Sequence, residues 1–179
     1  MHTDDMAARG IGRFIVPGPF WFFVAVVVVA PLPYGAAHLW SHSLLTILVG
    51  IALVLWVLAA TFDADAYAIP FARVGVPAAL LAVVLIWILV QSSPATPAAW
   101  HHPLWSEARS ALTEPSIRGA ISLNPDGAPL LLARLGTYAA VFWLAMQYGR
   151  SARRANIVFW AIAITGLLYA VYGISAHLS

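Results

Sequence analysis

The chain contains no cysteine, and charged residues make up only 9% of its 179 positions. Without cysteine there are no disulfides, no thiolate metal sites and no cysteine nucleophiles. All nine basic residues are arginine and the formal net charge is +2, so the sequence does not indicate a clustered basic surface that binds nucleic acid. Ordinary soluble domains carry about 25% charged residues. The shortage of charge therefore excludes a soluble domain of ordinary composition.

Apolar side chains are abundant, at 62% of the residues. They fall in separate runs of roughly 20 residues, the length of helix that crosses a hydrocarbon core about 30 Å thick. Because a helix satisfies its backbone polar groups internally, such runs cross lipid as helices. The sequence predicts an all-α integral membrane protein with about five transmembrane helices. The predicted spans are Ile15 to Tyr34, Leu44 to Thr61, Val74 to Gln91, Pro129 to Tyr148 and Asn156 to about Ser175.

The first predicted span has an alternative interpretation. A basic leader, an apolar stretch and the small residues Gly35-Ala36-Ala37 are also typical of a cleaved signal peptide. The acidic pair Asp4-Asp5 and two late prolines fit that interpretation poorly, so we expect a retained helix.

Arginine placement predicts the orientation, because short cytoplasmic loops retain positive charge. One side of the predicted topology carries Arg9, Arg13, Arg73, Arg150, Arg153 and Arg154, and the other carries only Arg109 and Arg118. We therefore expect a bacterial inner-membrane protein with residues 1–14 in the cytoplasm and three spans within 15–91. A periplasmic loop at 92–128 and two spans within 129–179, with a periplasmic C-terminus, complete the prediction.

The long periplasmic loop contains two local signals. Pro103 to Leu112 is predicted to form a short helix that lies in the membrane interface, since its apolar residues share one face. The stretch Asn124-Pro125-Asp126-Gly127 predicts a turn that leads into the fourth span.

Two groups of residues resemble metal ligands. Asp63 and Asp65 have the DxD spacing that holds a divalent cation in many nucleotide-sugar transferases, but two carboxylates in a short loop bind a hard cation weakly. Four histidines fall on the predicted outer side, with no recognised metal spacing: His38, His42, His101 and His102. We interpret the acids as solvated and the histidines as loop or interfacial residues, and predict no metal site. A proton-linked role for the histidines stays open.

Arg134 lies within the fourth predicted span, where a charge at the bilayer centre costs about 2.5 to 3.5 kcal/mol. Five residues from Pro129 correspond to a depth of roughly 8 Å, so the long side chain can snorkel to the surface. Snorkelling, stabilisation of the helix bundle and contact with an anionic substrate group are three open interpretations. Thr137, Tyr138 and Val141 follow on the same helical face, which therefore carries polar groups that could line a cavity. Arg134 is thus the one candidate substrate-binding residue.

The sequence has no phosphate-binding glycine loop, no nucleophile elbow and no HExxH motif. From the residues alone we predict no catalytic residue and no cofactor.

Several short motifs occur along the chain in an order that resembles a known family. They are Pro31-Leu-Pro-Tyr-Gly35 before Trp40, His102-Pro-Leu-Trp105, Ile121-Ser-Leu-Asn-Pro125, the run from Leu131 through Arg134 to Tyr138 with Val141-Phe142, and Tyr172-Gly173. In this order and context they resemble the N-terminal portion of the O-antigen ligase and O-antigen polymerase superfamily. These are bacterial membrane glycosyltransferases that use polyprenyl-diphosphate-linked glycans.

The resemblance implies a longer protein that transfers or polymerises lipid-linked polysaccharide at the periplasmic face. Its transfer chemistry would depend on arginines and a histidine in a second half that this chain does not include, so we expect the chain to be inactive alone. An alternative is a small non-enzymatic membrane subunit of a transporter or synthase complex. A self-contained transporter is a third hypothesis, disfavoured because paired charges and broken half-helices are missing.

Overall fold

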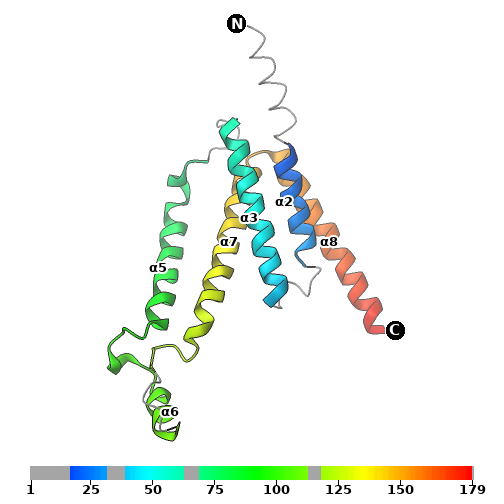
Figure 1. The fold of residues 1–179 in the computed structure, drawn as a ribbon. Coiled ribbons are helices and arrows are strands. Elements are labelled where there is room, and N and C mark those ends of the chain that lie inside the picture. Colours follow the sequence, from blue (N-terminus) through cyan, green and yellow to red (C-terminus); the bar gives the residue numbers. More distant parts are fainter. Residues whose placement is uncertain (1–16, 32–38, 63–68, 113–117, 179) are drawn as a thin grey trace. The chain divides into compact units, whose positions relative to one another are not determined.

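A computed structural model describes residues 17–31, 39–62, 69–112 and 118–178 of the chain (Figure 1). These residues form helices and connecting turns, with no strand among them. The elements are α2 (Pro17–Val29), α3 (Leu39–Phe62), η2 (Phe71–Val74), α5 (Gly75–Ser92), η3 (Ala98–Trp100), α6 (Leu104–Leu112), η4 (Pro125–Gly127), α7 (Ala128–Gly149) and α8 (Ala152–Leu178).

Among the described residues, four helices are long and apolar enough to cross a membrane: Trp40–Phe62, Ala72–Ser92, Pro125–Gly149 and Ala152–Leu178. The fifth apolar helix, α2, has 13 residues and a length of about 20 Å, which is shorter than the hydrocarbon core. The first predicted span continues beyond the described residues on both sides of α2. The chain is therefore an all-α, multi-pass membrane protein, as its composition predicts.

The helix ends confirm some predicted boundaries and correct others. The helices α5 and α7 match the predicted spans to within one residue at each end. The helix α3 begins at Leu39 and not at Leu44, and α8 begins at Ala152 and not at Asn156. Both were predicted too short because polar residues occupy their first turns. Arginine side chains at the start of α8 are long enough to reach water from a helix end, so they do not terminate it.

The chain divides into two compact units, one formed by residues 1–69 and 137–179 and the other by residues 70–136. The helix α7 contributes its first residues to the second unit and the rest to the first.

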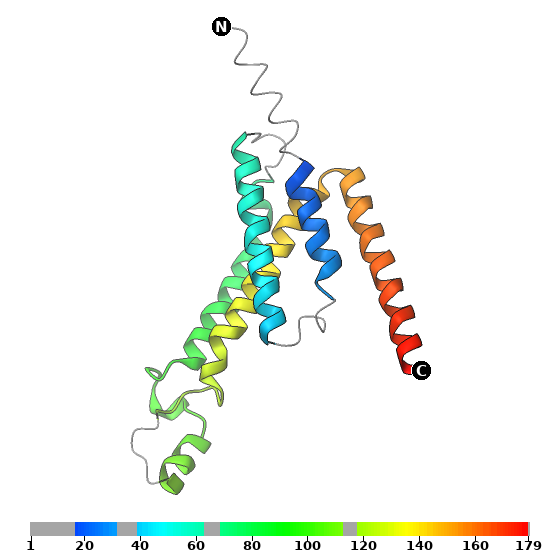
Figure 2. The same cartoon turned by 45° about the vertical axis from the view of Figure 1, so that its right-hand side comes forward.

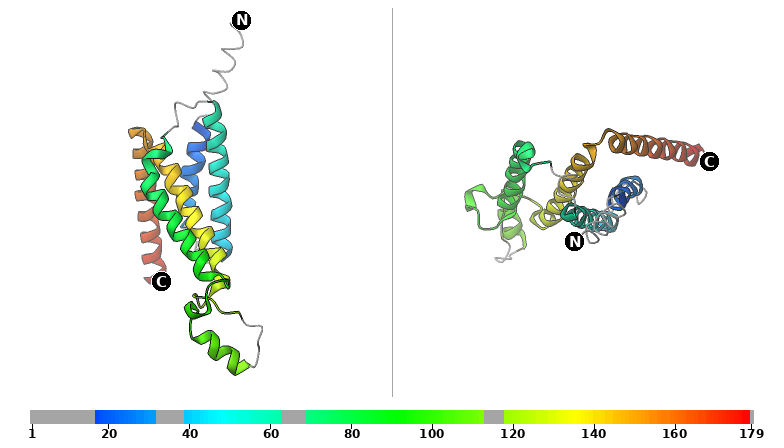
Figure 3. Two further views of the ribbon diagram at one scale, coloured as in Figure 1. Left: turned by 90° about the vertical axis from the view of Figure 1, so that its left-hand side faces the viewer. Right: turned by 90° about the horizontal axis from the view of Figure 1, so that it is seen from above.

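In the first unit, α8 diverges from α7 after the turn that joins them (Figure 2). The short helix α2 lies between α3 and α8 (Figure 3). Its buried aromatic residues pack on the last turn of α7, where the Tyr148 ring centroid lies 5.5 Å from Phe20 and 5.4 Å from Phe23. The rest of this core is apolar and comprises Val24, Ala52, Ala59 and Leu144. Side-chain packing thus fixes α2 within the unit.

The side chain of Gln147 forms a second link within this unit. It is 2% exposed, its Oε1 accepts a hydrogen bond from the Ile69 backbone N–H at 3.1 Å, and its Nε2 donates to the Ile69 carbonyl at 3.4 Å. One amide therefore satisfies both backbone groups of a residue that belongs to no helix. These two hydrogen bonds hold Ile69 against the end of α7.

In the second unit the long loop folds back on the end of α5. The Ser122 N–H donates to the Gln91 carbonyl at 2.8 Å, and the His102 N–H donates to the Ala120 carbonyl at 3.0 Å. The indole Nε1 of Trp105 in α6 donates to the Ser122 carbonyl at 3.2 Å. These bonds connect the two ends of the loop, and α6 lies near one end of α5 (Figure 3).

Both local signals in the loop are confirmed as elements. The helix α6 begins one residue after the predicted start and ends at the predicted Leu112. The predicted turn is η4, in which the Asn124 Oδ1 accepts a hydrogen bond from the Gly127 N–H at 3.2 Å. The location of α6 in the membrane interface stays a prediction.

The α2 packing can be tested with a matched pair of substitutions. Phe23→Ala removes a ring that is 2% exposed, whereas Phe159→Ala removes one that is 64% exposed. We expect Phe23→Ala to lower the free energy of unfolding by about 3 kcal/mol, because a cavity replaces the ring, and Phe159→Ala to change it by about 0.5 kcal/mol or less. Denaturant titration of the detergent-solubilised protein, followed by circular dichroism, measures both. Equal losses for the two variants would contradict the packing described.

Candidate functional site

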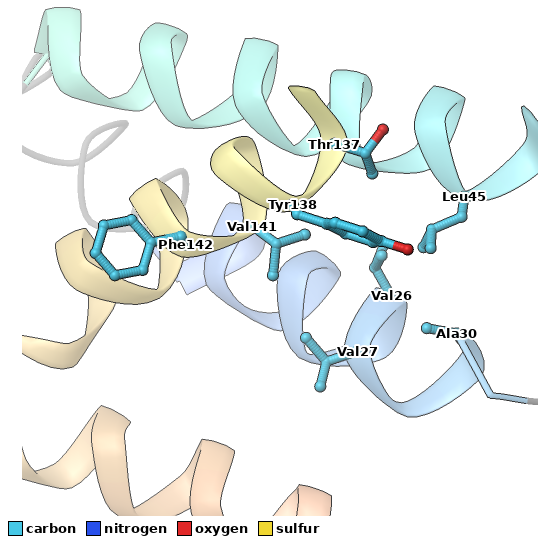
Figure 4. A pocket seen from close by; sticks show the side chains of 8 residues that line it. All are labelled: Val26, Val27, Ala30, Leu45, Thr137, Tyr138, Val141 and Phe142. Atoms are coloured by element: carbon cyan, nitrogen blue, oxygen red, sulfur yellow. The ribbon is translucent and has the colours of Figure 1, made fainter. Parts of the chain in front are cut away.

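A groove in the first unit is formed by three helices and has a volume of about 370 Å³ (Figure 4). Apolar side chains line most of it, and its polar atoms come from two adjacent residues of α7. The lining consists of Val26, Val27, Ala30, Leu45, Thr137, Tyr138, Val141 and Phe142. The Tyr138 ring extends from α7 between α3 and α2, and Thr137 points toward α3 (Figure 4). A groove of this kind suits an apolar chain with a polar group at one side.

A group of polar side chains connects α3 to α7, and one of them, Thr137, also lines the groove. The Thr46 hydroxyl lies 3.0 Å from the Thr137 hydroxyl and 3.0 Å from the His42 carbonyl. The His42 Nε2 lies 3.5 Å from the same Thr46 oxygen. His42 and Thr137 are buried, at 2% and 4% exposure, and neighbouring Ser41 is fully buried. We call Ser41, His42, Thr46 and Thr137 the polar cluster.

The chemistry of a hydroxyl assigns the donors in this cluster. A hydroxyl carries one proton and two acceptor lone pairs, and a backbone carbonyl can only accept. Thr46 donates its proton to the His42 carbonyl and therefore accepts from the Thr137 hydroxyl. The long contact to His42 is then favourable when Nε2 carries a proton. The cluster thus connects α3 to α7 through the two threonine hydroxyls.

Arg134 lies on α7, six residues after Ala128, and is half-buried. Its Nε atom is buried and donates no hydrogen bond to any described residue. A buried donor without an acceptor costs about 1 to 3 kcal/mol, and more when it is charged. Arg134 does not line the groove, whereas Thr137, Tyr138 and Val141, which follow it on α7, all do. The structure therefore leaves a charged donor of α7 without an acceptor in the described protein.

The chain matches no known protein family, no curated protein and no solved structure. The resemblance to O-antigen ligases and polymerases therefore rests on the motifs quoted above and stays a prediction. The structure itself supports an all-α, multi-pass membrane fold.

The loop histidines serve the backbone of the second unit. The His101 Nε2 lies 2.9 Å from the Thr96 carbonyl, so this nitrogen carries the proton and donates. The His102 Nδ1 accepts from the Leu104 N–H at 3.3 Å. A Cβ atom on Gly119 would lie 2.6 Å from the His101 ring, so the absence of a side chain there permits the close approach. The two imidazoles thus have separate partners and do not face one site.

The remaining candidate ligands give no metal site in the part of the chain that the structure describes. Among those residues, no three His, Cys, Asp or Glu side chains are grouped closely enough to hold an ion. His38, Asp63 and Asp65 lie outside the described residues.

Reasoning from the sequence missed the polar cluster and Gln147. A signal for half of the cluster was present, because His42 and Thr46 are four residues apart and so share a helical face. The partner Thr137 is 91 residues from Thr46, and only packing of α3 on α7 brings them together. Gln147 gave no signal beyond being polar in an apolar run.

A double-mutant cycle tests the link between α3 and α7. Thr46→Val and Thr137→Val should each destabilise the protein, and the double variant should lose less than the sum by about 0.6 kcal/mol, which is typical of membrane-buried hydrogen bonds. Thr165→Val on α8 is the matched control. The free energy of unfolding in detergent or bicelles gives all four values. Strict additivity of Thr46→Val and Thr137→Val would show that the two hydroxyls do not interact.

Proposed function

We propose that this chain is the N-terminal membrane portion of an O-antigen ligase-like or polymerase-like protein, which handles polyprenyl-diphosphate-linked glycan at the periplasmic face of a bacterial inner membrane. The observation that carries the proposal is Arg134, whose buried Nε donates to no described residue. The choice of family rests on the resemblance in motif order described in the sequence analysis. On this proposal the chain binds substrate and does not catalyse transfer by itself.

The chemistry of a lipid diphosphate fits an arginine in this setting. A guanidinium presents its N–H donors in a planar fork that matches two phosphate oxygens, and it stays charged at physiological pH. A diphosphate would give Nε the acceptor that the described protein does not supply. Separately, the groove of the first unit offers apolar walls of a kind that accommodate a polyprenyl chain.

The proposal includes the orientation with the N-terminus in the cytoplasm, supported by the arginine asymmetry. In that orientation Arg134 lies nearer the periplasmic end of α7, where a lipid-linked glycan would present its diphosphate.

Substitution of Arg134 tests the proposal in cells. The complete gene, including any coding sequence that continues past Ser179, is expressed in a strain from which it has been deleted, and surface polysaccharide is quantified. We expect the wild-type gene to restore assembly and Arg134→Gln to reduce it about tenfold or more, since a charge-assisted hydrogen bond contributes about 1.5 to 3 kcal/mol. Arg134→Lys should retain part of the activity, because it keeps the charge and loses the fork.

The matched control is Arg109→Gln, which removes the same charge from exposed α6 and should leave assembly unchanged. Full assembly by Arg134→Gln at normal protein level would overturn the role of Arg134. Failure of the wild-type gene to restore surface glycan, together with stable recovery of the chain with one defined membrane partner, would favour the non-enzymatic subunit.

The orientation has its own test, which the absence of cysteine makes simple. Ala99→Cys places a thiol on the long loop and Ser151→Cys places one in the turn between α7 and α8, both at exposed positions. We expect a membrane-impermeant maleimide to label Ala99→Cys in spheroplasts and to label Ser151→Cys only after the membrane is permeabilised. The reverse pattern would invert the topology.

A further inference from the structure

The first turn of α6 depends on one histidine side chain. The first N–H groups of any helix have no acceptor within the helix. In α6 the N–H groups of residues 105–107 donate to the backbone carbonyls of His102 and Pro103, at 2.9 to 3.4 Å. The Leu104 N–H has no backbone acceptor among the described residues and donates to the His102 Nδ1 at 3.3 Å. A side chain therefore satisfies the first N–H of this helix.

The backbone of His102 also joins α6 to the other side of the loop. Its N–H donates to the Ala120 carbonyl at 3.0 Å, and its carbonyl accepts from the Trp105 N–H at 3.0 Å. The Trp105 indole in turn donates to the Ser122 carbonyl at 3.2 Å. Because α6 has only nine residues, it is marginal as an isolated helix in water. The start of α6 and its attachment to residues 118–122 thus depend on the same residue.

The bond from Leu104 requires a neutral imidazole at His102. An imidazole nitrogen accepts a hydrogen bond only when it carries no proton, and in the cationic ring both nitrogens are donors. Protonation would turn Nδ1 into a donor that opposes the Leu104 N–H. It would also place a positive charge at the positive end of the helix dipole. Histidine is the side chain whose charge ordinarily changes between pH 5 and 8.

We propose that His102 is a pH-sensitive cap of α6. At neutral pH its Nδ1 accepts from Leu104 and the helix is held on residues 118–122. On acidification Leu104 loses its acceptor, the first turn opens and α6 separates from that segment. The device responds to pH on the side of the membrane where the loop lies. It involves neither Arg134 nor the groove of the first unit, so it is independent of the proposed function.

Neighbouring His101 does not share this sensitivity. Its Nε2 donates to the Thr96 carbonyl at 2.9 Å, and a protonated ring still donates from that nitrogen. The two adjacent histidines therefore differ in role, since one ring acts as an acceptor and the other as a donor.

The charged groups on the segments that meet at His102 give it no ion pair. They are Glu107 and Arg109 on α6 and Arg118 on the facing segment, and all three are exposed. His102 forms no ion pair with any described residue. Exposed charges are screened by water and salt, and two of these three are positive. They therefore supply no contact that offsets the loss of the cap in acid.

The absence of cysteine permits a direct test on the full chain in neutral detergent. A nitroxide is attached to Ala111→Cys, an exposed position on α6, and its mobility is measured by electron paramagnetic resonance at pH 8 and pH 5. We expect the ratio of mobile to immobile label to rise about tenfold at pH 5, since the cap is lost and the dipole contact becomes unfavourable. A label at Ser151→Cys, between α7 and α8, controls for general effects of acid and should not respond.

Three substitutions in the Ala111→Cys chain assign the response. His102→Asn keeps an acceptor that does not titrate, so the label should stay immobile at both pH values. His102→Ala has no acceptor, and its label should be mobile at both. His101→Gln keeps a donor toward Thr96 and should respond to pH as the parent does.

Two outcomes would overturn the proposal. A full pH response in His102→Asn would assign the titration to another group. An immobile label at pH 8 in His102→Ala would show that α6 does not need the imidazole as a cap.

Discussion

The packing of Phe20 and Phe23 against Tyr148 determines how the first unit is built. The described part of α2 is shorter than the hydrocarbon core, and side-chain contacts fix it between α3 and α8. Those ring contacts, at 5.5 and 5.4 Å, join its first two turns to the last turn of α7. The other end of α2 then forms one wall of the 370 Å³ groove, through Val26, Val27 and Ala30. The groove exists because α2 is anchored at the opposite end.

The lipid environment changes which side chains this protein buries. Between helices in a bilayer the hydrophobic effect gives little drive for association, so packing and hydrogen bonds decide which faces meet. Large apolar residues of α8 such as Phe159 and Leu168 are exposed, whereas Ser41, His42 and Gln147 are buried. Each of the three has a polar partner in the protein, which lipid would not provide. Polar side chains therefore act as the specific contacts of the first unit.

The sequence was sufficient to predict the helical membrane fold, because run length and bilayer thickness together determine it. The ends of α5 and α7 followed from the same argument, and the turn at Asn124 from its own residues. The starts of α3 and α8 did not, since Ser41, His42 and Arg153 continue a helix whose hydropathy has already fallen. Arg134 was identified as a charge in an apolar run. The α7 wall of the groove followed from the sequence, because Thr137, Tyr138 and Val141 share a helical face and all three line it. The walls from α2 and α3 did not, because no local pattern records how distant helices pack.

The bond between Gln147 and Ile69 has a consequence for the order in which the protein is made. The partner of the Ile69 backbone lies 78 residues further along the chain. At about 5 to 20 residues per second, the ribosome needs roughly 4 to 16 s to synthesise that intervening stretch. During this interval the N–H and carbonyl of Ile69 must be solvated by water or lipid head groups. The hydrogen bonds of Ile69 to Gln147 therefore form only after Gln147 has been synthesised, so this contact of the first unit is made late in synthesis.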